Sequence, residues 1–182
     1  SLASSRRAVE LAERFASVYA VVGVHPNHVM EEADDIRPAL RELTGHPRVV
    51  AVGETGLDFY RLGGKSVSEV EAIRAKQGRL FEQQLEVAAE AGLNCVIHQR
   101  DAFAGALERV RVHRERVRTV FHCFTGTPAE AAAVVEAGSL LSFTGITTFK
   151  NAQNIRDSLA SLPGDRFMLE TDCPFLAPLV AE

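Results

Sequence analysis

The sequence predicts an α/β fold in which buried parallel strands alternate with helices along the chain of 182 residues. Three observations predict this class. Short apolar runs recur from one end to the other, each run is nearly continuous in apolar residues, and amphipathic segments lie between the runs. Near-continuous apolar strands are typical of parallel strands buried on both faces. Repeated strand–helix units leave two architectures, an open doubly wound sheet and a (β/α)8 barrel.

The expected strands are short and rich in Val, Leu and Phe. They are Val18–Val24, Val49–Val52, Leu93–Ile97, Thr119–Phe124, Ser139–Phe143 and Arg166–Leu169. About six strands are two fewer than a barrel requires, and 182 residues is below the ~250 typical of that fold. By this count alone, the open sheet competes with the barrel.

Helical spacing of apolar residues predicts the connecting helices. They are expected at Ser4–Phe15, Glu69–Ala91, Asp101–Val112, Pro128–Ala137 and Asn151–Leu162. Gly92 is placed to end the longest of them, and Thr127 before Pro128 is a favourable helix start. No internal repeat or linker interrupts the pattern, so we expect one domain over residues 1–182.

Composition limits the possible partners and compartments. A formal net charge of −4 does not suit broad electrostatic wrapping of nucleic acid, so a phosphate substrate would be captured locally by a few basic residues or by bound cations. The three cysteines form neither a disulfide framework nor a CxxC zinc motif, and we expect reduced, buried thiols in a cytoplasmic protein. No apolar stretch approaches the ~20 residues of a membrane span. The sequence indicates no obligate protein partner.

Polar residues of one chemical kind close several of the predicted strands. Glu54 follows the second run, His98 the third, His122 lies in the fourth and Asp172 follows the last. A closed sheet would bring such strand ends to one rim, where barrel enzymes place their chemistry. Imidazoles and carboxylates suit Zn or Mn, and a carboxylate-rich site also accepts Mg. The pattern therefore predicts a metal site and favours the barrel.

The segments around these residues resemble the TatD family of metal-dependent deoxyribonucleases, which are amidohydrolase-type TIM barrels. The resemblance runs in order from about Ala20 to Pro178. It is carried by GVHP (23–26), GETGLDFYR (53–61), VIHQR (96–100), FHCFTG (121–126), SFTGITTFKN (142–151) and ETDCPFLAP (170–178).

The resemblance implies a role for each matching position. Glu54 would bridge two divalent ions (Mg, Mn or Zn), His98 and His122 would bind one of them, and Asp172 would bind the other. Glu54 and Asp172 would be catalytic, Glu54 as the bridge between the two ions and Asp172 because it also orients or deprotonates the attacking water. The implied substrate is DNA, as single strands or ends. Candidate substrate contacts are His25, Arg61, Arg100 and Lys150.

The sequence lacks one element of the family pattern. The family opens with a strand that ends in His-x-His, and no such motif occurs in this sequence. If Val18–Val24 corresponds to the third barrel strand and Phe167–Leu169 to the eighth, the chain is an incomplete barrel. We then expect it to bind at most one metal ion tightly and to be weakly active or inactive by itself.

Two other functions fit the same residues. The first is another hydrolase on this scaffold, acting on a lactone, an amide or an aminoacyl ester, because such barrels change chemistry through their loops. The second is a truncated, non-catalytic barrel that acts as a scaffold.

Overall fold

The computed structural model describes residues 1–179, apart from the side chain of Arg61. Within that part of the chain, strands and helices alternate as the sequence predicts, and all pairings between neighbouring strands that we describe are parallel. The chain divides into two compact units, Ser1–Arg118 and Thr119–Glu182.

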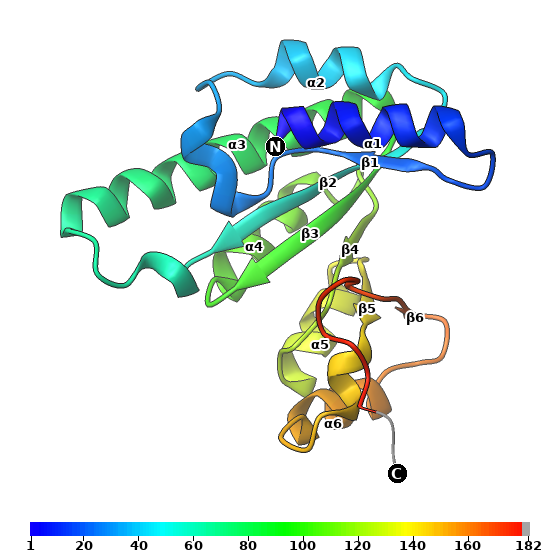
Figure 1. The fold of residues 1–182 in the computed structure, drawn as a ribbon. Coiled ribbons are helices and arrows are strands. Elements are labelled where there is room, and N and C mark those ends of the chain that lie inside the picture. The colour runs from blue at the N-terminus through cyan, green and yellow to red at the C-terminus, as the bar shows by residue number, and fades with distance from the viewer. Residues whose placement is uncertain (180–182) are drawn as a thin grey trace. The chain divides into compact units, whose positions relative to one another are not determined.

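The first unit contains a parallel sheet whose three strands follow one another in chain order. Helices α1, α2 and α3 lie along the same side of this sheet (Figure 1). Its elements are α1 (Leu2–Arg14), β1 (Ala20–Val22), η1 (Pro26–Glu31), α2 (Arg37–Thr44), β2 (Val49–Asp58), η2 (Tyr60–Leu62), α3 (Val67–Ala91), β3 (Asn94–Arg100) and α4 (Phe103–His113).

Two buried glutamines on α3 complete the backbone hydrogen bonds of the sheet. The Gln84 side chain accepts a hydrogen bond from Val24 N and donates one to Val24 O. Gln77, two helical turns earlier, accepts from Asp58 N and donates to Asp58 O. Because a buried backbone group without a partner is costly, the two side-chain amides hold the backbone in place at Val24, after β1, and at Asp58, the last residue of β2.

The second unit contains a parallel sheet of β4, β5 and β6, again in chain order. Its core includes an aromatic row in which Phe143 makes edge contacts with Phe124 and Phe167 at ring-centroid distances of 6.2 and 6.1 Å. The elements are β4 (Thr119–Phe121), α5 (Pro128–Glu136), β5 (Leu140–Phe143), η3 (Gly145–Thr148), α6 (Gln153–Ala160) and β6 (Phe167–Leu169).

The predicted helix ends at Gly92 and Thr127 are confirmed. Gly92 ends α3 with a left-handed φ of 65°, and Thr127 caps α5 in a reciprocal capping box with Glu130. In both units strand order follows the chain without the reversal that marks a doubly wound sheet, which favours the barrel.

The structure corrects several predictions. The second strand does not end at Val52 but continues to Asp58, and the third continues past Ile97 to Arg100, so Glu54 and His98 lie inside strands rather than after them. The fourth strand ends at Phe121 and not at Phe124, so His122 follows it. The short helix α2 was not predicted, because it has eight residues and its second residue is Pro38. It is stabilised by the buried side chains of Leu40 and Leu43.

Across residues 1–179, none of the helices combines the length and apolar character that crossing a bilayer requires.

Candidate metal centre

Glu54 owes its position to an irregularity in the middle of β2. The pairing register with β3 shifts between Val52 and Thr55, and Gly53 there has a φ of +150°. A Cβ at Gly53 would come within 2.8 Å of the Val96 side chain, and one at Gly56 (φ +139°) would overlap the carbonyl oxygen of His98. The glycines on either side of Glu-Thr therefore let β2 lie close against β3.

The close approach of the strands brings Glu54 to His98. His98 Nδ1 lies 2.8 Å from Glu54 Oε1, and the two side chains are 19% and 32% exposed. The structure therefore brings together two of the four predicted metal ligands, from neighbouring strands.

The other ring nitrogen of His98 contacts a carboxylate outside the predicted set of ligands. His98 Nε2 lies 3.2 Å from Asp58 Oδ2, and the Asp58 side chain is 2% exposed. Burial alone would raise the pKa of Asp58, but hydrogen bonds from His98, Tyr60 N and Asn27 outweigh it and lower that pKa to about 2. For His98, burial lowers the pKa, while hydrogen bonds with Asp58 and Glu54 prevail and raise it.

His25 contributes a second imidazole from the segment after β1. Its Nε2 lies 3.5 Å from Glu54 Oε1, and its ring centroid is 4.4 Å from that of His98. Its Nδ1 accepts a hydrogen bond of 3.0 Å from Asn27 N at the start of η1. A neutral imidazole carries one proton, so this contact places the proton on Nε2, the nitrogen that faces Glu54.

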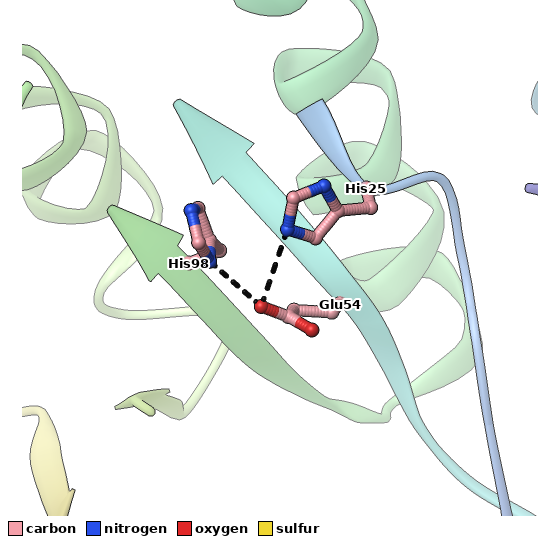
Figure 2. A group of neighbouring side chains, drawn as sticks. All are labelled: His25, Glu54 and His98. Atoms are coloured by element: carbon pink, nitrogen blue, oxygen red, sulfur yellow. Dashed lines mark hydrogen bonds and ion pairs between the residues drawn. The ribbon is translucent and has the colours of Figure 1, made fainter. Parts of the chain in front are cut away.

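Among the described residues, His25, Glu54 and His98 form a group whose donor atoms all lie within 4.8 Å of one another (Figure 2). A carboxylate with imidazoles at this separation fits Zn or Mn. The two imidazoles are not equivalent, however. His25 directs an N–H at Glu54, whereas His98 can direct a lone pair at it while its Nε2 donates to Asp58. Glu54 and His98 are therefore the better ligands, and His25 is the better hydrogen-bond donor.

His122 and Asp172 belong to the second unit. His122 follows β4 directly, and its Nδ1 lies 3.1 Å from Glu170 Oε1. The same Glu170 oxygen accepts a 2.9 Å hydrogen bond from Cys123 N and a short one from the hydroxyl of Ser142. Burial would raise the pKa of Glu170, but these hydrogen bonds outweigh it and lower that pKa to about 2. Asp172 lies in the turn after β6 and is partly buried.

Three predicted substrate contacts have different surroundings. The guanidinium of Arg100, at the end of β3, lies 3.5 Å from the centroid of the Tyr60 ring. Lys150 is exposed in the segment after η3. The side chain of Arg61 is outside the described part of the structure. Their role in substrate binding stays a prediction.

Comparison with known proteins identifies the family to which these motifs belong. A sequence model of the family described as "TatD related DNase" matches residues 1–181. The chain is 35% identical over 173 residues to an uncharacterized metal-dependent hydrolase, YabD, of Bacillus subtilis. The matched region covers 94% of this chain and 65% of that protein. It is 37% identical over 180 residues to the 3'-5' ssDNA/RNA exonuclease TatD of Cronobacter turicensis, covering 98% and 65%.

Solved structures give the same result. The crystal structure of the TatD homologue YjjV from Escherichia coli superimposes with a TM-score of 0.84 at 28% identity, covering 96% of this chain and 65% of that one. This similarity confirms the predicted fold, a TIM barrel of which this chain carries part. The chain spans slightly less than two thirds of the length of these relatives.

Proposed function

This chain belongs to the TatD-related DNase family, and from that premise we propose that the protein hydrolyses phosphodiester bonds in single-stranded DNA with metal-activated water. The observation that carries the proposal is the contact between Glu54 and His98 across two barrel strands. We also propose that residues 1–182 form one metal-dependent hydrolase domain, in which His122 and Asp172 complete the ligand set. That assignment rests on the motif match.

The residues divide the chemistry between them. Two divalent ions (Mg, Mn or Zn), bound by the proposed ligands, would lower the pKa of a bound water and neutralise charge on the scissile phosphate. Glu54 would share its carboxylate between them, and Asp172 would orient the attacking water and accept its proton. His25 would donate its Nε2 hydrogen to a phosphate oxygen beside Glu54, as its tautomer allows.

The proposed substrate follows from the relatives and from the shape of a barrel mouth. The Cronobacter relative is named as an exonuclease of ssDNA and RNA, and a recessed barrel mouth admits a single strand more easily than a duplex. Arg61, Arg100 and Lys150 are the proposed phosphate contacts. The cytoplasm is the proposed compartment, because the three cysteines are free thiols.

The test is cleavage of an end-labelled single-stranded oligonucleotide by the intact protein with Mg, Mn or Zn. We expect EDTA to abolish cleavage and Glu54→Gln to reduce the turnover rate about 100-fold or more, because the bridging charge is lost. Glu13→Gln is the matched control, since Glu13 also pairs with an imidazole (His46, 3.0 Å) but at an exposed site. It should leave turnover unchanged.

Two results would contradict the proposal. One is cleavage that persists in EDTA. The other is hydrolysis of a lactone, an amide or an aminoacyl ester by a protein that leaves DNA and RNA intact with every metal tested. Cleavage of RNA in preference to DNA would correct the substrate and keep the reaction.

A further inference from the structure

Asp58 is a buried carboxylate to which the proposed reaction assigns no role. It ends β2, four residues after Glu54, and its side chain is 2% exposed. A charged group in that position is costly unless hydrogen bonds compensate it. The groups that supply those bonds show what the carboxylate can do.

The Asp58 carboxylate is held at both oxygens. Oδ1 accepts a 3.0 Å hydrogen bond from Tyr60 N. Oδ2 accepts one of 3.1 Å from the Asn27 side chain and faces His98 Nε2 at 3.2 Å. Gln77 fixes the backbone of the same residue from α3. The carboxylate is therefore a rigid acceptor whose direction is set before any ligand binds.

We infer that Asp58 is a positioning residue, which keeps the proton of His98 on Nε2 and so directs the Nδ1 lone pair toward Glu54. The inference deepens the proposed function, on which it rests for the assignment of Glu54 and His98 as metal ligands. An ionised carboxylate can only accept hydrogen bonds, so His98 Nε2 must be the donor. With its Nε2–H bonded to Asp58, the neutral ring has its lone pair on Nδ1, where a cation beside Glu54 would be bound.

The neighbouring imidazole shows that this tautomer choice is needed. His25 and His98 both present a nitrogen to Glu54 Oε1, at 3.5 and 2.8 Å. The His25 nitrogen carries a proton, because its other nitrogen accepts from a backbone N–H. Without Asp58, His98 could adopt the same arrangement, with a proton where the lone pair should be.

Asp58→Asn tests this inference because it keeps the shape and changes the donor pattern. If the amide oxygen keeps the bond from Tyr60 N, its NH2 group faces His98 Nε2 and donates to it. The proton of the neutral imidazole then moves to Nδ1, and Nδ1 has no lone pair left with which to bind a cation. If the amide adopts the opposite orientation, its oxygen still accepts from His98 Nε2, but its NH2 group faces Tyr60 N and the hydrogen bond from Tyr60 N is lost.

The experiment measures metal binding and imidazole NMR in the intact protein. Zn affinity is obtained by competition with a chromophoric chelator, and long-range 1H–15N spectra are recorded with 113Cd bound. In wild type we expect 113Cd–15N coupling at Nδ1 of His98 and a proton on Nε2. Asp58→Asn should weaken Zn binding about 10- to 100-fold and, in the metal-free protein at alkaline pH, move the proton to Nδ1.

The control is Asp35→Asn, the same chemical change at an exposed carboxylate bonded to Arg37. It should alter neither affinity nor the spectrum. Coupling of 113Cd to Nε2 of His98 in wild type would overturn the inference and needs no variant, so it applies even if Asp58→Asn fails to fold. An unchanged Zn affinity in a folded Asp58→Asn protein whose spectrum shows the His98 proton on Nδ1 would also overturn it. A protein with the expected tautomer that cleaves no nucleic acid would instead refute the proposed function.

Discussion

Single residues decide the chemistry of this site through their protons. As neutral rings, the two imidazoles that face Glu54 differ in what they present to it, a lone pair from His98 and an N–H from His25. The difference arises from the atom behind each ring, a buried carboxylate in one case and a backbone N–H in the other. The proposed ligand and the proposed substrate contact are therefore distinguished by their hydrogen bonds, although both are histidines near the carboxyl ends of neighbouring strands.

The cysteines show how burial controls reactivity. All three were expected to be buried thiols, which is right for Cys95 and wrong for Cys173, which is exposed; Cys123 is intermediate. Burial raises the pKa of the Cys95 thiol well above its ordinary value of 9.0. The thiolate is the reactive form, so Cys95 should be inert.

We predict that a disulfide reagent at pH 8 modifies Cys173 quickly and Cys95 about 100-fold more slowly or slower still, because Cys95 must first be exposed by local opening. Cys173→Ser should remove the fast phase. Stability should fall as the pH rises above about 9, where the unfolded chain loses a proton that folded Cys95 retains. Equal rates at the two thiols would show that Cys95 is accessible.

The residues of the site were predictable to different degrees. Glu54 and His98 could be predicted from polar residues beside apolar runs, and the structure brings them together. Asp58 was missed because the strand was expected to end at Val52. With the strand continued, Glu54 and Asp58 stand four positions apart, a spacing that places two strand residues on one face. The longer strand was not apparent because Gly53 and Gly56 are usually read as a turn.

At the scale of elements, α3 contributes buried polar side chains that its amphipathic pattern does not indicate. Gln77 and Gln84 lie on the same helix face as the buried Leu80 and Phe81. Glutamine is usually exposed, so a pattern of apolar spacing does not mark these positions. Their partners are backbone groups of Val24 and Asp58, far away in sequence, and only the folded structure reveals that these groups have no strand neighbour to bond.

We predict that Gln84→Leu lowers the free energy of unfolding by about 2–4 kcal/mol, because it leaves buried N–H and C=O groups of Val24 without partners. Urea unfolding at pH 7 measures the change. Gln153→Leu, the same replacement at an exposed position of α6, should change it by about 0.5 kcal/mol or less. A loss at Gln84 no larger than this control would mean that water replaces the amide.

At the largest scale, the 182 residues together carry a formal net charge of −4. If the chain hydrolyses nucleic acid as proposed, it must hold the polyanion at a few points. The proposed contacts are His25, Arg61, Arg100 and Lys150, with the bound cations supplying the remaining positive charge. Binding should therefore depend much less on salt than it does for a protein with a broad basic surface.

This difference can be measured as a salt slope. Each phosphate neutralised on a single strand contributes about −0.7 to the slope of log K against log salt, so three or four contacts give about −2 to −3. We predict that value for a non-hydrolysable oligonucleotide, measured by fluorescence anisotropy at constant divalent concentration. Arg100→Ala should make the slope shallower by about 0.7. Arg41→Ala, which removes a guanidinium paired with Glu90, should leave it unchanged. A slope steeper than about −5 would require an extended row of basic side chains along the bound oligonucleotide. The proposal that the protein holds the oligonucleotide at a few phosphates would then be wrong.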